Sequence, residues 1–229
     1  GLADPKGYLE SLRQAVGPEL YIVVEKILGE GEHIPSDWPI AGTTGYEFIG
    51  TLADVLVDGG MTDAVDRAYA TVTGRDPDPL EELRNAKLLM ANNNFEGEVA
   101  TLKNLAVKLH EAEAAGEEIQ PEAMHEALRE LLVAFPVYRT YGTERGMPEE
   151  GKDLLGKIGK SVESGPHAPD PNALAFIQRL LSGEVNAEQA KDAALFRTRF
   201  QQLTGPLMAK SLEDTLFFRD HRFIALNEV

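Results

Sequence analysis

The sequence predicts a mainly α-helical protein with a few short parallel strands. Two observations support this prediction: strand signals are confined to the first 60 residues, and helical periodicities follow one another after Gly60. The length of 229 residues, compared with about 150 residues for a typical domain, indicates one large domain or one domain with an inserted lobe. Hydrophobic residues make up 43% and charged residues 26% of the chain, which is typical of a folded globular protein.

The first 60 residues alternate helix and strand signals in the manner of a β-α-β unit. Asp4-Pro5 favours the start of a helix, and Gly17-Pro18 favours its end. The run 20–24 is apolar on both faces and rich in β-branched residues, which is typical of a buried parallel strand. This strand ends at Glu25.

A second strand-and-helix signal follows a loop rich in glycine and proline. Residues 39–41 could form one more short strand. Thr43 or Thr44 can cap a helix with several apolar positions, and Asp58-Gly59-Gly60 ends it.

Beyond Gly60 the apolar residues recur at helical spacing. A long helix is predicted from Leu80 to about Ala115, because the apolar residues from Phe95 to Leu109 are spaced by four, three, four and three residues and share one face. The asparagines 92–94 allow a bend in this helix. Glycine and proline in 143–171 predict a mobile loop around a short helix. Gly205-Pro206 predicts a turn between two helices. The predicted helical stretches after Gly60 are 65–72, 80–115, 121–135, 152–161, 174–181 and 190–200.

Charge and composition exclude several classes of function. The 22 basic and 38 acidic residues give a formal net charge of −16, which repels phosphate backbones and anionic lipids, so we expect neither nucleic acid nor membrane as partner. No apolar run approaches the ~20 residues of a membrane span. The absence of cysteine fits a reducing cytoplasm, and the histidines lack metal-ligand spacing, so no metal is expected. The chain begins without Met, as if cut from a longer protein.

Glu25 is the first candidate for chemistry. A carboxylate directly after a buried strand lies at the strand's carboxyl end, where the loops of β/α enzymes build active sites. Partial burial there would favour the protonated form that a general acid needs. The simpler interpretation from spacing alone is a solvated ion pair with the adjacent Lys26.

A second cluster lies in 135–141, where two phenols and a guanidinium fall within four residues. Aromatic faces and planar donors are what sugar-binding sites use. The same alternation also fits an edge strand with half of its side chains buried. Trp38 is either a stacking platform for a sugar or a core residue, and His221, between two charged residues, is most simply part of a surface charge cluster.

Several longer segments resemble a known family. They are similar to maltooligosyltrehalose synthase of the α-amylase superfamily. The resembling segments are 23–28 (Val-Val-Glu-Lys-Ile-Leu), 41–48, 135–141, 200–214 and 226–229. The resemblance implies part of a (β/α)8 barrel that carries a helical insertion. The implied parts are a partial barrel with the acid/base strand in 1–60, an inserted helical lobe in 61–195, and a return to the barrel in 196–229.

The resemblance also implies roles for individual residues. Glu25 becomes the general acid/base of a retaining reaction on an α-glucan. The residues expected to line the sugar sites are Trp38, Tyr46, Arg139, Tyr141, Lys210 and Glu213. Two departures from the family pattern are Glu47, where Asp is usual, and Ser211, where Gly is usual. The run 218–221 also departs from the pattern, which argues against a sugar contact by these residues.

The implied reaction moves the reducing-end α-1,4 bond of a maltooligosaccharide to an α,α-1,1 bond by intramolecular transglycosylation, without metal or cofactor. Retaining chemistry needs two carboxyl groups ~5 Å apart. The resemblance places the nucleophilic Asp before residue 1 and a stabilising Asp beyond residue 229, so this chain alone is expected to be inactive and to self-associate through uncovered apolar faces. Another α-amylase-superfamily hydrolase and a non-catalytic helical assembly piece are the alternatives.

Overall fold

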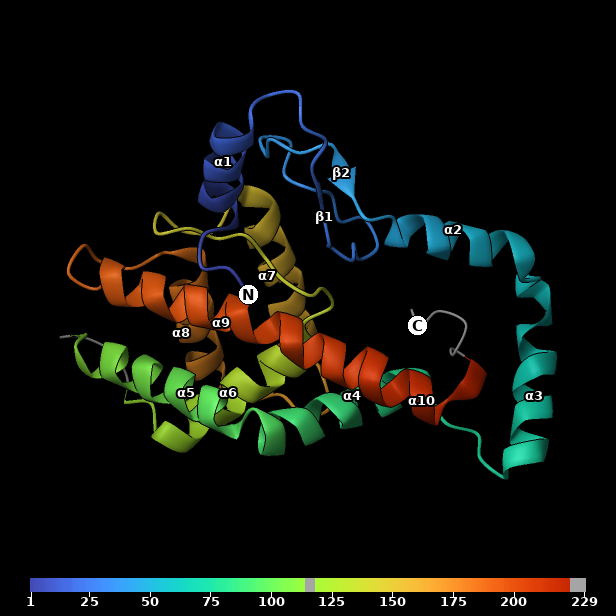
Figure 1. The fold of residues 1–229 in the computed structure, drawn as a ribbon. Helices are drawn as coiled ribbons and strands as arrows, with labels where there is room; N and C mark the ends of the chain where they lie inside the picture. Colours follow the sequence, from blue (N-terminus) through green and yellow to red (C-terminus); the bar gives the residue numbers. More distant parts are fainter. Residues whose placement is uncertain (114–117, 223–229) are drawn as a thin grey trace. The chain divides into compact units, whose positions relative to one another are not determined.

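The computed structural model describes residues 1–113 and 118–222 (Figure 1), and over these residues it is mostly helical with two short strands. Its contacts divide the chain into two compact units. The helical unit consists of Gly1 and Lys87–Ala209, and the strand unit consists of Leu2–Ala86 and the residues from Lys210 onward. The division into a partial barrel in 1–60, an inserted lobe in 61–195 and a return to the barrel in 196–229 stays a prediction. The resembling segment 226–229 lies outside the described residues.

In the strand unit, α1 (Pro5–Val16) begins and ends as predicted. The carboxylate of Asp4 accepts a hydrogen bond from the N–H of Gly7, and Gly17, with φ of +87°, ends the helix. The unit also contains β1 (Val23–Val24), β2 (Gly42–Thr43), α2 (Tyr46–Leu56), a 3₁₀ turn (Gly59–Met61) and α3 (Thr62–Thr73). Its C-terminal part holds a π-helical turn (Leu212–Leu216) and α10 (Phe217–Arg219).

The two strands pair in parallel, with Val23 opposite Gly42 and Val24 opposite Thr43. The strand predicted at 20–24 is therefore shorter, because Leu20 and Tyr21 are exposed and only the residues from Ile22 onward meet a partner. The second strand lies after 39–41 rather than within it. Residues 25–41 link the strands without a helix, which differs from a regular β-α-β unit.

The predicted threonine cap of α2 is wrong. Gly45 is the cap residue, in a left-handed conformation with φ of +104°, and it offers no side chain. The hydroxyl of Thr43 instead accepts a hydrogen bond from the N–H of Gly45 at 3.1 Å and contacts the carboxylate of Glu47. Thr43 thus stabilises the turn that leads from β2 into α2.

The helical unit is built around one apolar core. Its helices are α5 (Glu96–Glu111), α6 (Pro121–Ala134), α7 (Glu149–Glu163), α8 (Pro171–Ser182) and most of α9 (Ala190–Ser211). α4 (Pro79–Leu89) reaches this unit at Lys87. The largest fully buried apolar side chains of the core are Phe135, Phe196, Phe200, Leu102, Met124, Leu128, Leu131, Leu132, Ile177, Leu180 and Leu181.

The long helix predicted from Leu80 is interrupted where the asparagines allow a bend. A π-helical turn (Met90–Asn94) separates α4 from α5, and Ala91 within it is buried. The short helix predicted at 152–161 is longer, since α7 begins at Glu149 and ends at Glu163. Residues 114–115 of the predicted long helix lie outside the described residues.

The turn predicted at Gly205-Pro206 is wrong, because α9 continues through both residues. Proline removes one backbone hydrogen bond of a helix interior. Leu203 and Leu207, on either side of this pair, are almost completely buried in the core. We infer that burial of this apolar face keeps the helix continuous despite the proline. None of the described helices is both long and apolar enough to cross a membrane.

Candidate functional site

Glu25 directly follows β1, at the carboxyl end of the parallel pair. The hydroxyl of Tyr46, the first residue of α2, donates a hydrogen bond of 3.1 Å to the carboxylate of Glu25. β1 and the start of α2 therefore bring together two of the predicted site residues. The carboxylate is exposed, so the partial burial predicted for it is not provided by the residues described around it.

Lys26 does not form the ion pair with Glu25 that spacing alone suggested. Its ammonium group lies 2.7 Å from the carboxylate of Glu32 and also donates to the carbonyl of Ile27. The same carboxylate accepts the N–H of Gly29 at 2.9 Å. Burial lowers the pKa of Lys26, although the hydrogen bond to Glu32 opposes this change. Lys26 and Glu32 thus close the loop after β1. The carboxylate of Glu25 accepts its hydrogen bond from Tyr46 instead.

Trp38 lies half-buried in the loop before β2. This loop is fixed to α1, because the guanidinium of Arg13 donates to the carbonyl of Pro39 at 2.8 Å and Lys6 pairs with Asp37 at 2.6 Å. Half-burial is compatible with both the stacking platform and the core residue that the sequence allowed. The role of Trp38 stays a prediction.

Lys210 and Glu213 lie where α9 passes into the π-helical turn, also in the strand unit. The ammonium group of Lys210 pairs with Asp214, one helical turn further on. The hydroxyl of Thr215 donates to the carbonyl of Lys210 at 2.7 Å, which stabilises the widened turn. Lys210 is exposed and Glu213 is half-buried.

Arg139 and Tyr141 belong to the helical unit. The guanidinium of Arg139 lies 5.8 Å from the centre of the Tyr141 ring, a cation–π contact. Burial lowers the pKa of Arg139, and Tyr141 opposes this change. The edge strand that the alternation allowed is wrong, since residues 135–142 form no strand.

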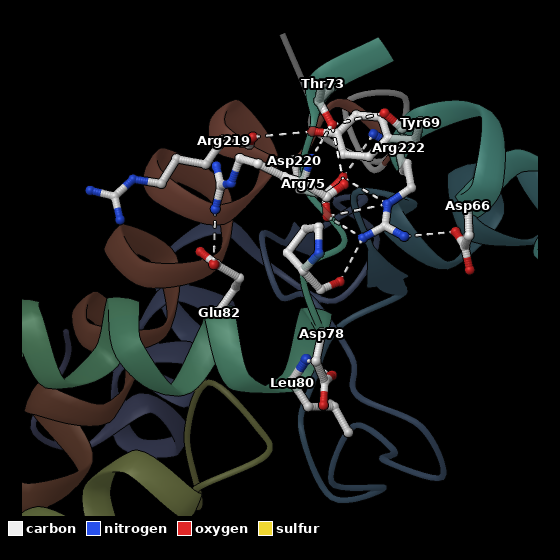
Figure 2. A network of polar contacts seen from close by, with 11 residues as sticks. Asp66, Tyr69, Thr73, Arg75, Asp78, Leu80, Glu82, Arg219, Asp220 and Arg222 are labelled. Carbon is white, nitrogen blue, oxygen red and sulfur yellow. Dashed lines mark hydrogen bonds and ion pairs between the residues drawn. The ribbon is translucent and has the colours of Figure 1, made fainter. Parts of the chain in front are cut away.

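The charged cluster around His221 is not a surface cluster. Figure 2 shows the guanidinium of Arg222 between the carboxylates of Asp220 and Asp66, at 2.6 and 2.7 Å, and beside the ring of Tyr69. The side chains of Asp220 and Arg222 are only 2% and 9% exposed. The ion pair lowers the pKa of Asp220 and raises that of Arg222. Asp220 and Arg222 therefore hold residues 220–222 to α3, whereas His221 is exposed.

Three polar residues that bind buried or loop backbone were not predicted from the sequence: Glu32 in the strand unit, and Lys87 and Gln201 in the helical unit. The signal available for Gln201 was its place in the resembling segment 200–214. Within 1–113 and 118–222, no three His, Asp or Glu side chains come close enough to hold a metal ion.

Comparisons with known proteins support the resemblance. No family model matches the chain. It is 28% identical over all 229 residues to putative maltooligosyl trehalose synthases of two Mycobacterium tuberculosis strains, CDC 1551 / Oshkosh and H37Rv, and it spans 27% of their length. Maltooligosyltrehalose synthase from Arthrobacter ramosus is a structural neighbour with a TM-score of 0.74 and 27% identity, over 95% of this chain and 25% of that one.

A second solved structure agrees. DSM5389 glycosyltrehalose synthase superposes with a TM-score of 0.67 and 28% identity, over 97% of this chain and 24% of that one. The resemblance to maltooligosyltrehalose synthase predicted from the sequence is therefore confirmed. The chain corresponds to about a quarter of the length of the proteins that it matches.

Proposed function

We propose that the full-length protein containing this chain converts the reducing-end α-1,4 bond of a maltooligosaccharide into an α,α-1,1 bond, with Glu25 as general acid and base. One observation carries the proposal: a carboxylate at the carboxyl end of a parallel strand, held by Tyr46, in a chain that matches maltooligosyltrehalose synthases over its whole length. The names of these relatives support trehalose-forming glycosyl transfer.

In this reaction Glu25 donates a proton to the glycosidic oxygen and later accepts one from the anomeric hydroxyl of the released glucose. After the first proton transfer, the hydroxyl of Tyr46 stabilises the resulting carboxylate and fixes its orientation. The second carboxyl group of a retaining mechanism is expected outside this chain.

We place β1 and β2 as neighbouring strands of a (β/α)8 barrel, with the acid/base strand in 1–60, an inserted helical lobe in 61–195 and a return in 196–229. The parallel register and the direct passage from β2 into α2 support this placement. In such barrels the active site lies at the carboxyl ends of the strands, which is where Glu25 stands.

The remaining site residues are proposed as ligands of the maltooligosaccharide. Tyr141 offers an aromatic face for a sugar ring, and Arg139 beside it offers planar donors for hydroxyl groups. Trp38 is proposed as a second stacking face. Lys210 and Glu213 are proposed to bind sugar hydroxyls through their charged groups.

The test uses the full-length protein with maltopentaose and measures both reducing ends and trehalose-ended product. Isomerisation removes reducing ends, whereas hydrolysis adds them, so the two activities change the signal in opposite directions. Replacement Glu25→Gln should lower kcat by about 10²–10⁴-fold, the contribution typical of a general acid or base. Glu30→Gln, at an exposed glutamate in the following loop, is the matched control and should leave kcat unchanged.

Two results would contradict the proposal. Activity of Glu25→Gln equal to that of the control would remove Glu25 from the mechanism. A net gain of reducing ends by the unmodified protein would favour the hydrolase alternative.

We further propose that this chain alone is inactive and self-associates. The apolar side chains of α2 support the second point, since Phe48, Val55 and Leu56 are 69%, 77% and 76% exposed. Sedimentation that shows a compact monomer of the isolated chain would contradict self-association.

A further inference from the structure

The segment 138–143, which carries Arg139 and Tyr141, is held by one face of α9 within the helical unit. Three residues spaced four apart, Arg197, Gln201 and Gly205, form this face, because such residues lie above one another on a helix. We call them the α9 stripe. Arg197 donates to the carbonyl of Thr143, and the carbonyl of Tyr138 lies 3.5 Å from where a Cβ at Gly205 would stand.

Gln201 is the centre of the α9 stripe and makes three hydrogen bonds to the segment. Its side-chain oxygen accepts the hydroxyl of Thr140 at 3.2 Å and the N–H of Gly142 at 2.6 Å. Its side-chain nitrogen donates to the carbonyl of Gly142 at 3.0 Å. Gln201 is only 1% exposed, so its amide is satisfied by protein groups rather than by water.

These bonds fall on both sides of Tyr141, at residues 140 and 142. On one side the backbone of Gly142 is bonded to α9, and on the other the side chain of Thr140 is, whereas the tyrosine ring itself meets the guanidinium of Arg139. A bond made through the backbone of a neighbour restricts where a side chain can lie. The close approach also requires glycine at 142, where an added Cβ would lie 2.5 Å from the Cδ of Arg197.

We infer that Gln201 is a positioning residue for maltooligosaccharide binding: it holds Tyr141, and through it Arg139, in the arrangement that receives a sugar. This inference rests on the proposed role of Arg139 and Tyr141 as sugar ligands. A buried glutamine that served only the stability of the core would predict a change in unfolding but no change in the affinity for sugar.

The experiment is a double-mutant cycle in the full-length protein, with Gln201→Met, Tyr141→Ala and the combined variant. KM and kcat for maltopentaose are measured well below the unfolding temperature of every variant, and maltopentaose affinity is measured in parallel by calorimetry. Gln201→Met should raise KM and Kd about tenfold, the change that a loss of about 1.4 kcal/mol produces. It should change kcat much less, since Gln201 does not contact the reacting atoms.

The matched control is Gln189→Met. Gln189 is also a buried glutamine of the helical unit, and its side-chain nitrogen donates to the carbonyl of Leu109 at 2.7 Å. This replacement should lower stability without changing KM. If Gln201→Met does not fold, Thr140→Val removes one of the three bonds with a side chain of the same shape, and it should raise KM about threefold.

If Gln201 acts through Tyr141, Gln201→Met has no further effect on KM or Kd once Tyr141 is alanine. Independent, additive effects of the two replacements would overturn the inference, as would an unchanged Kd in folded Gln201→Met. Calorimetry separates this result from failure of the proposed function, because it reports sugar binding even if the unmodified protein forms no trehalose-ended product.

Discussion

The buried ammonium group of Lys87 gives a prediction whose size follows from the structure. Lys87 is 4% exposed, and its Nζ donates to the carbonyls of Val133 and Phe135 at 3.2 and 2.6 Å, at the end of α6. Burial lowers the pKa of Lys87 to about 8 from an ordinary value of 10.5. The folded state therefore binds fewer protons than the unfolded state between these two pH values.

The free energy of unfolding must then rise with pH across this window, because the unfolded state binds the additional proton. With a folded pKa of about 8 and an unfolded value of 10.5, the contribution of Lys87 to stability increases by about 2 kcal/mol from pH 7 to about pH 9.5. Below about pH 7 the contribution is nearly constant, since both states are then protonated.

The assay is urea unfolding of the chain at both pH values, with and without the replacement Lys87→Met. Methionine has a similar length but cannot titrate, so the variant should lose the increase of about 2 kcal/mol. Lys157→Met is the matched control, because Lys157 is an exposed lysine of α7, and its pH dependence should equal that of the unmodified chain. Parallel pH profiles for Lys87→Met and the unmodified chain would refute the reasoning.

Three further replacements test structural features by urea unfolding. Asp220→Asn removes one of the two carboxylates that pair with Arg222 and should cost about 1.5–3 kcal/mol at pH 7, because Asp66 still neutralises the guanidinium. Since the pKa of Asp220 is lowered, this contribution should vanish as the pH falls through that pKa, and an unchanged acid limb would contradict it. Gly146→Ala should cost about 1–3 kcal/mol, because φ is +120° and the added Cβ would lie 2.6 Å from the carbonyl oxygen of Ser182. Gly156→Ala, in open space on α7, should instead stabilise by about 0.5–1 kcal/mol, and equal effects of the two glycine replacements would contradict this reasoning.

Helix ends were predicted well where they depend on neighbours in sequence. Asp4 caps α1 through the N–H of Gly7, and Pro121 stands at the first residue of α6. The π-helical turn at 90–94 coincides with the asparagines that allowed a bend. Each of these features depends on a few consecutive residues, so local pattern is sufficient to find it.

The prediction failed where a distant contact outweighs a local preference. Gly205-Pro206 favours a turn, yet the buried faces of Leu203 and Leu207 keep α9 helical. The alternation in 135–141 allowed an edge strand, but Gln201 bonds to Thr140 and Gly142 in place of a neighbouring strand. Packing energies of this kind exceed the small differences in local propensity.

The sequence by itself determined that the chain is mainly helical, that Glu25 directly follows a parallel strand, and that the chain resembles maltooligosyltrehalose synthase. The tertiary structure decided which polar groups meet: Tyr46 with Glu25, Glu32 with Lys26, and Gln201 with the segment that carries Tyr141. Periodicity specifies which face of an element is buried, but a hydrogen bond requires two groups within about 3 Å of each other. Only the folded chain brings residues that are far apart in sequence to that distance.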